Sequence, residues 1–167
     1  MFSETDISER IKPFIKTLPH TQVKYPESFS HKLRRKFWHV YTPYHETLRD
    51  TLVSIGIVRQ KVKRQAFLLG KLPSNSVFEE FVKFLIDQGY GRHLVAWRDE
   101  GEILGLRYTE DFTYQYHLRI FNDGEIRGHY EYTPESHPVA HLIETVFEDR
   151  RQEFMKLLGD RIVPIKE

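Results

Sequence analysis

Two histidines, His117 and His129, are the residues of this sequence best suited to chemistry, because a predicted β-hairpin brings them face to face. Imidazole changes its charge near neutral pH, so a pair of imidazoles can move protons to or from a ligand. Glu131 follows His129 by two positions and is expected to orient the pair. Tyr116 and Tyr130, on the same strands, would line a cavity. One hypothesis is therefore a small-molecule-binding or catalytic site built from these five residues, and the alternative is a polar ladder without a ligand.

The hairpin that positions the histidines is predicted from its turn and its side-chain pattern. Apolar and polar residues alternate over residues 112–120 and again over 126–132, as in strands with one buried face. The turn that ends in Gly124 suits a three-residue loop with glycine in the left-handed conformation. That loop pairs Ile120 with Ile126, whereas a shift by one residue would mix the two faces.

The same register sets Arg119 opposite Arg127 on the polar face, beside the two histidines. Like charges that face each other repel, so such a cluster on one patch of sheet predicts a site for an anion. The competing interpretation is a solvated sheet face on which Glu125 and Glu131 neutralise the arginines.

A second basic surface is predicted for a helix at residues 28–41, whose charged side chains lie away from an apolar stripe. Residues 57–72 alternate like a strand with one basic face. Basic side chains interleaved with aromatic ones are typical of nucleic-acid-binding surfaces. The alternative is a helical hairpin that packs on the sheet and is solvated by its lysines and arginines. The predicted anion-binding residues are Lys32, Arg34, Arg35, Lys36, Arg59, Lys61, Lys63, Arg64, Arg119 and Arg127.

The charges are unevenly distributed along the chain, although its formal net charge is only +1. Residues 1–75 contain 14 Lys and Arg against 6 Asp and Glu, whereas residues 76–167 contain 11 against 18. Such asymmetry indicates a surface for a polyanion or electrostatic self-association with a protein partner. It also arises when two oppositely charged faces pack together.

No metal site and no cofactor are expected. His137, His141 and Glu144 have the spacing of metal ligands on a helix, but their stripe lies almost opposite the apolar face and should be exposed. The sequence contains no glycine-rich phosphate loop before a helix and no serine nucleophile elbow. The lack of a catalytic motif favours a binding protein over an enzyme.

Composition restricts the class of protein further. The absence of cysteine excludes disulfides and cysteine nucleophiles, and it fits a cytoplasmic protein. No apolar run approaches the ~18 residues that a membrane span needs, so no membrane association is expected. The acidic start of the chain is unlike a secretory signal.

Periodicity and breaker residues predict the elements that carry these sites. A helix at residues 4–18 should be interrupted at Pro13, and Thr42-Pro43 should separate the helix at 28–41 from a second one that ends near Ile55. The remaining predicted elements are a strand at 57–72, a helix at 77–88, a four-stranded meander from Leu94 to Tyr132, and a helix at 138–158 capped by Gly159.

The expected fold class is α+β, with a mostly antiparallel sheet of about five strands covered on one face by helices. Residues 1–56 would form an N-terminal helical segment packed on an α+β domain of residues 57–167. The leading functional hypothesis is a non-catalytic module that binds nucleic acid or another polyanion. The small-molecule site and a protein–protein interaction module are the alternatives.

Overall fold

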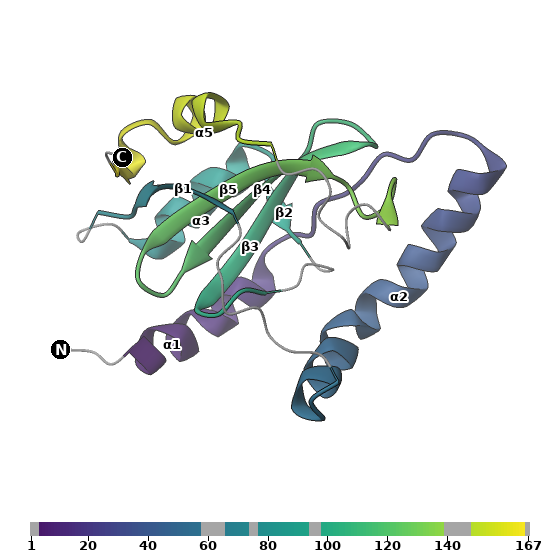
Figure 1. Cartoon of the computed structure of the whole chain (residues 1–167), viewed down its shortest axis with the longest axis horizontal. Coiled ribbons are helices and arrows are strands. Elements are labelled where there is room, and N and C mark those ends of the chain that lie inside the picture. Colours follow the sequence, from purple (N-terminus) through teal and green to yellow (C-terminus); the bar gives the residue numbers. More distant parts are fainter. Residues whose placement is uncertain (1–3, 58–65, 74–76, 94–97, 139–147, 166–167) are drawn as a thin grey trace.

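The computed structural model describes residues 4–57, 66–73, 77–93, 98–138 and 148–165 and shows an α+β fold (Figure 1). The helices are α1 (Glu4–Thr17), α2 (Phe29–Ser54), α3 (Phe78–Asp87) and α5 (Arg151–Leu158), with a 3-10 turn at Gly159–Arg161. The strands are β1 (Phe67–Lys71), β2 (Gly91–Arg92), β3 (Glu102–Thr109), β4 (Tyr114–Phe121), β5 (Glu125–Tyr132) and β6 (Val163–Pro164). They form one antiparallel sheet in the order β2-β3-β4-β5-β1-β6.

The β4–β5 hairpin has the predicted register. Ile120 pairs with Ile126, and Gly124 has a φ of 81°, as the left-handed position of the turn requires. β3 continues the alternation on the other side of β4 and pairs Leu106 with Leu118. One face of the sheet is therefore apolar across three neighbouring strands, and the other is polar.

The pairing before β3 differs from the prediction. Residues 94–97 lie outside the described residues, and the described strand that pairs with β3 on the side away from β4 is β2. Arg92 pairs with Leu106, whereas a three-residue loop ending in Gly101, which we predict by analogy with the loop ending in Gly124, pairs Leu94 with Leu106. A shift of two residues keeps each side chain on its face, because strand side chains alternate with a period of two. Gly101 has a φ of 76°, the left-handed conformation that glycine adopts in such a turn.

The apolar face of the sheet forms one hydrophobic core with side chains from α1, α3 and α5, and Figure 1 shows these helices around the sheet. α3 matches the helix predicted at 77–88. Its phenylalanine, valine and leucine side chains pack against the central strands because the helix is apolar around most of its circumference. The fully buried core residues include Val82, Leu85, Leu106, Leu118, Ile120, Ile126, Phe154 and Leu158.

α1 runs through Pro13 without the interruption that the sequence predicts. Ile11, Ile15 and Leu18 are buried in the core, whereas Pro13 is exposed. The apolar side chains on both sides of the proline hold one helix against the sheet. Their burial offsets the hydrogen bond that proline cannot donate.

α2 is also one continuous helix, although the sequence predicts a break at Thr42-Pro43. It stands beside the sheet rather than in the core (Figure 1). Its apolar stripe, which one interpretation of the sequence packs on the sheet, is exposed, with Phe29 at 84% and Tyr44 at 68%. Arg35 and His39 line a pocket on the opposite side of the helix, so the polar side of α2 is the one turned to the sheet.

The predicted single helix at 138–158 does not form as one unit. Glu148 is extended and exchanges backbone hydrogen bonds of 3.0 and 2.9 Å with Tyr130, and α5 begins at Arg151. Gly159 follows α5 with a φ of 55°, as its predicted role as a cap requires. The tail then adds β6 as an edge strand beside β1.

β1 covers only the end of the strand predicted at 57–72, of which residues 58–65 lie outside the described residues. The pairing with β5 shifts between Leu68 and Gly70. Such a bulge changes which side chains face inward, and Leu69 is buried in the core whereas Leu68 is half-buried.

We expect Gly128→Ala to lose about 1–3 kcal/mol of unfolding free energy, because it overpacks the core. An alanine Cβ there would lie 2.9 Å from Phe154 Cζ and 3.0 Å from Leu69 Cδ1. A Phe154→Leu background should reduce the loss, and urea denaturation of both single variants and the double variant measures it. If the losses of the two single variants simply add in the double variant, the Phe154 ring is not what excludes a side chain at Gly128.

Candidate functional site

The second face of the sheet is polar and yet buried. Its side chains come from alternate positions of β3, β4 and β5 and from the segments that flank these strands. Buried polar groups are costly unless they are paired, so the contacts among them define the candidate site. The buried polar residues of this region are His93, Asp99, Glu102, Arg107, Gln115, His117, Arg119, His129, Glu131 and Glu135.

Glu131 joins the two histidines that the sequence predicts to meet. Its Oε1 lies 3.3 Å from His117 Nδ1 and 3.2 Å from His129 Nε2. The same oxygen accepts a 2.8 Å hydrogen bond from Gln115 Nε2. The two imidazole rings lie 4.9 Å apart between centroids, as direct cross-strand neighbours. The structure therefore brings these three predicted residues together on one face.

A third histidine, His93, completes the cluster from the residue after β2. Its Nδ1 lies 3.4 Å from His117 Nε2. Donor atoms of His93, His117 and Glu131 lie within 4.8 Å of one another, which makes them the group of described residues able to hold a metal ion. Burial lowers the pKa of His117 to about 4, although the neighbouring Glu131 carboxylate acts in the opposite direction. The imidazole is therefore neutral at neutral pH.

Arg107 and Glu135 form a buried ion pair beside this cluster. Arg107 donates hydrogen bonds of 2.9 and 2.7 Å to the two carboxylate oxygens. Arg107 Nη1 also donates to Gln115 Oε1 at 3.1 Å. Because Gln115 in turn donates to Glu131, one chain of hydrogen bonds runs from Glu135 to Glu131, whose carboxylate contacts both histidines.

Arg119 and Arg127, which the sequence predicts as anion ligands, contact carboxylates of the chain itself. Arg119 Nη1 lies 3.0 Å from Asp99 Oδ2 and 3.1 Å from Glu102 Oε2. Arg127 Nε donates a 2.9 Å hydrogen bond to Glu125 Oε2. Glu125 thus neutralises Arg127, as the competing interpretation expects. Arg119 is instead neutralised by Asp99 and Glu102, while Glu131 contacts the two histidines, and Arg119 is buried rather than solvated.

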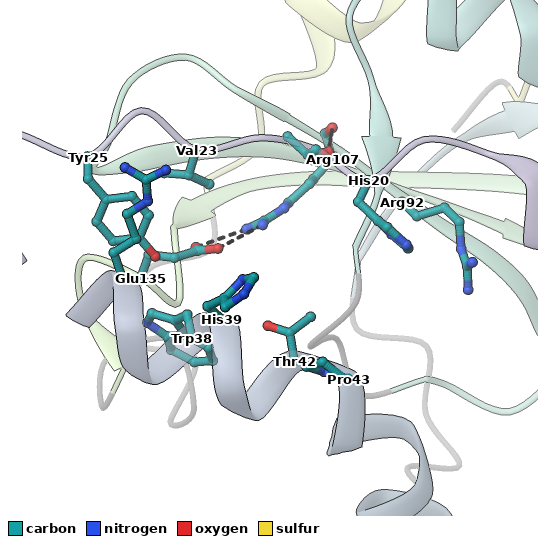
Figure 2. A pocket seen from close by; sticks show the side chains of 12 residues that line it. His20, Val23, Tyr25, Trp38, His39, Thr42, Pro43, Arg92, Arg107 and Glu135 are labelled. Atoms are coloured by element: carbon teal, nitrogen blue, oxygen red, sulfur yellow. Dashed lines mark hydrogen bonds and ion pairs between the residues drawn. The ribbon is translucent and has the colours of Figure 1, made fainter. Parts of the chain in front are cut away.

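A pocket of about 550 Å³ lies between α2 and the sheet (Figure 2). Its walls are α2, the extended segment at residues 20–25, Arg92 and Arg107 from the sheet, and Glu135. Figure 2 shows His39 and Thr42 pointing from α2 toward the Arg107–Glu135 pair. The pocket therefore opens directly onto the hydrogen-bonded chain that leads to the histidines.

Contacts at the N-terminal end of α2 hold this helix beside the sheet. The Phe112 ring lies 4.9 Å from the His31 ring and 5.2 Å from the Tyr25 ring. Arg34 Nη1 donates a 2.9 Å hydrogen bond to the carbonyl of Ser136. These contacts join α2 to the loops after β3 and β5, so the helix is held at the edge of the polar sheet face.

The predicted basic residues are divided between different places. Lys32, Arg35 and Lys36 border a hollow of about 460 Å³ together with His39, and the pocket shares Arg35 and His39 with this hollow. Arg34 turns instead to Ser136. The predicted residues outside the described part of the chain are Arg59, Lys61, Lys63 and Arg64.

The tyrosines of the small-molecule hypothesis lie on the opposite sheet face from the histidines. Tyr116 and Tyr130 are cross-strand partners with ring centroids 4.8 Å apart. Tyr116 borders a separate hollow of about 240 Å³ with Tyr90 and Tyr108. The Tyr130 hydroxyl donates to Glu110 Oε2. The five residues of that hypothesis therefore do not share one cavity.

The metal-like set on the predicted C-terminal helix is described only in part. His137 is exposed, and its ring stacks on the Tyr132 ring with the two centroids 4.4 Å apart. His141 and Glu144 lie outside the described residues.

Sequence reasoning missed His93, Arg107 and Glu135. Arg107 could have been predicted from the sequence, because continuing the strand alternation across β3 and β4 pairs this residue with His117. His93 and Glu135 follow β2 and β5 in segments without periodicity, so no local pattern places them in the cluster.

No protein-family model matches the chain, and no curated protein or solved structure is significantly similar to it. Among the described residues, no helix combines the length and the apolarity that crossing a membrane requires. The function has to be argued from the site, because an α+β fold by itself does not define one.

We expect Arg119→Met to lose about 3–5 kcal/mol of unfolding free energy, because Asp99 and Glu102 would remain buried without their cation. Urea denaturation measures the loss. The control Lys83→Met removes an exposed cation of α3 and should change stability by less than about 0.5 kcal/mol. Equal stability of the two variants would contradict a structural role for the Arg119 ion pairs.

Proposed function

We propose that this chain binds a phosphate-bearing ligand of the nucleotide class, free or as the end of a nucleic-acid strand, without a chemical step. One observation carries the proposal: Arg35, Arg92 and Arg107 line a single pocket together with Trp38 and Tyr25. Cations and aromatic rings around one hollow match a ligand that combines phosphate with a planar base.

The charge of the pocket favours an anion. Glu135 is the carboxylate among its described lining residues, and Arg107 already binds both of its oxygens. Arg35 and Arg92 add two further positive charges. Guanidinium groups bind phosphate oxygens in pairs, and a volume of about 550 Å³ lies within the usual range for small-ligand sites.

The aromatic residues supply a place for the base. Trp38 lies on α2 and is partly exposed in the pocket wall. Base–aromatic stacking contributes about 1–3 kcal/mol per base. Burial and the nearby Glu135 raise the pKa of Tyr25, so its phenol stays protonated and can donate a hydrogen bond.

The side of α2 that carries its lysines extends the pocket into a path for a longer polyanion. Lys32 and Lys36 border the adjoining hollow, and Arg35 belongs to both spaces. None of these three cations forms an ion pair within the part of the chain that the structure describes. A strand whose terminal nucleotide occupies the pocket would place its next phosphates along this side of the helix.

The test is a fluorescence-anisotropy titration with labelled single-stranded DNA and RNA at several salt concentrations, with AMP as competitor. Strand binding should weaken steeply with salt, because phosphate contacts release counterions. If AMP displaces the labelled strand at concentrations similar to the strand's own, the free nucleotide is sufficient for binding. Binding of strands without displacement by AMP would assign the site to nucleic acid, and no binding of either would overturn the proposal.

We expect Arg35→Glu to weaken this binding by at least about tenfold, since it replaces a charge-assisted contact with repulsion. Lys83→Glu makes the same charge change on α3 and should have little effect. Trp38→Ala should weaken binding by about 5–150-fold and Trp38→Phe by much less, if the ring stacks on a base. Equal weakening by Arg35→Glu and Lys83→Glu would indicate net charge rather than the pocket.

A further inference from the structure

The cluster of His93, His117 and Glu131 has the composition of a metal centre. The three residues are 8%, 1% and 4% exposed, and their donor atoms lie within 4.8 Å of one another. Imidazole and carboxylate groups are the ligands that zinc and neighbouring divalent metals use in proteins. A buried group of this kind requires an explanation beyond the hydrogen bonds of the sheet.

The two nitrogens of His117 have different surroundings. Nδ1 faces Glu131 Oε1 at 3.3 Å, and Nε2 faces His93 Nδ1 at 3.4 Å. A ligating histidine typically gives its second N–H to a carboxylate, which fixes the tautomer and the ring orientation. Two nitrogens at about 2.0–2.1 Å from a tetrahedral ion are themselves about 3.4 Å apart. Glu131 therefore occupies the orienting position, and His93 with His117 the ligand positions.

Gly105 leaves space beside His117 Nε2. A Cβ on Gly105 would lie 3.2 Å from this nitrogen and 2.9 Å from Glu102 Oε1. Glu102 Oε1 is buried and accepts no hydrogen bond from the described residues. A carboxylate oxygen thus borders the same space as the imidazole nitrogen.

We propose that a divalent first-row transition-metal ion binds at His93 Nδ1 and His117 Nε2, with Glu131 orienting His117 and Glu102 offering an oxygen donor on the Gly105 side. The proposal concerns a different set of residues from the nucleotide pocket and does not depend on it.

The experiment uses the full chain after dialysis against a chelator. Zn²⁺ is titrated by calorimetry, and Co²⁺ by its visible absorption, which reports the coordination directly. One equivalent of either ion should bind. His93→Gln and His117→Gln should each weaken binding by more than about 100-fold, and Glu131→Gln by about 10–100-fold. His137→Gln removes an exposed histidine outside the cluster and should bind like the parent chain.

Absence of one-equivalent binding to the parent chain would overturn the proposal, and so would equal weakening by His137→Gln and His93→Gln. Should the buried His117→Gln variant fail to fold, Gly105→Ala provides a second arm, because its methyl group fills the space beside Nε2. Unchanged affinity in both Gly105→Ala and His93→Gln would also reject the site. Nucleotide binding is measured separately on the metal-free chain. The metal proposal and the nucleotide proposal can therefore each fail without the other.

A different observation concerns the outward side of α2. An apolar stripe at spacings of three or four residues runs along the whole helix. Amphipathic helices normally bury such a stripe, and large exposed apolar patches mark interaction sites. The stripe comprises Phe29, Leu33, Phe37, Val40, Tyr44, Leu48 and Ile55, each between 45% and 84% exposed, together with the half-buried Leu52.

The stripe is nearly symmetric about the middle of the helix. Turned end to end around residue 42, it sets Phe29 against Ile55 and Val40 against Tyr44. Each of the other stripe residues falls one position from a counterpart, so an antiparallel pair of identical helices would bring apolar side chains together along most of its length. A twofold axis through the centre generates such a self-complementary contact.

The charges of α2 select the same arrangement. Its half at residues 29–42 carries four cations and no carboxylate, whereas residues 43–55 carry Glu46 and Asp50 against Arg49. Antiparallel pairing places Lys32 and Lys36 near Asp50 of a second copy, whose carboxylate also contacts Arg49 of its own helix at 2.7 Å. Parallel pairing would instead place the two basic halves side by side, which is unfavourable.

The geometry points to a second copy of this chain as the occupant, paired through antiparallel α2 helices. The pocket lies on the opposite side of α2, so the dimer leaves the pocket itself open, whereas Lys32 and Lys36 in the adjoining hollow lie beside the dimer contact. Light scattering of the full chain over a range of concentrations should show a dimer. Val40→Glu should give monomers at concentrations where the parent chain is dimeric, whereas Val77→Glu, at an exposed position before α3, should not.

A charge swap tests the orientation. Lys36→Asp and Asp50→Lys should each weaken the dimer, and the double variant should restore it, because the two positions face each other only in the antiparallel pair. A parent chain that stays monomeric at all concentrations would overturn the proposal. A dimer that Val40→Glu and Tyr44→Glu leave intact would do the same.

Discussion

The register between β4 and β5 decides which residues of this chain form the core and which form the site. Pairing Ile120 with Ile126 places leucine and isoleucine side chains of both strands against α3 and α5. The same pairing puts His117 beside His129 on the opposite face. A slip by one residue would bring the histidines and arginines of one strand into the apolar core, where their burial would be very costly. The turn at Gly124 therefore constrains both the stability and the chemistry of the sheet.

The polar face is a costly feature, because charges removed from water must be paired to be tolerated. The chain meets this requirement within a few strands. Arg119 contacts two carboxylates, and Arg107 binds Glu135 through two hydrogen bonds. Apolar residues would satisfy the same packing with less loss of hydration. A network that is retained at this cost and ends at an open pocket agrees with a role in ligand binding.

α2 reverses the usual orientation of an amphipathic helix. Its polar side faces the sheet and forms one wall of the pocket, whereas its apolar side faces outward. Contacts of Arg34 with Ser136 and of His31 with Phe112 hold it in this orientation. The two sides of one helix thus suit two kinds of partner, an anion on the inner side and a second apolar surface on the outer one.

The sequence by itself determined the α+β class, the β4–β5 register, α3 and the turn at Gly124, because these depend on residues that are neighbours in one hairpin or helix. It could not decide that α1 and α2 continue through Pro13 and Pro43, since burial elsewhere on each helix or contacts with distant loops outweigh a local breaker. Nor could it place His93 and Glu135 in the cluster, because neither belongs to a periodic element. Only the tertiary structure decided that the polar sheet face is buried and the stripe of α2 exposed. Pattern shows which side chains share a face, but burial depends on what packs against that face.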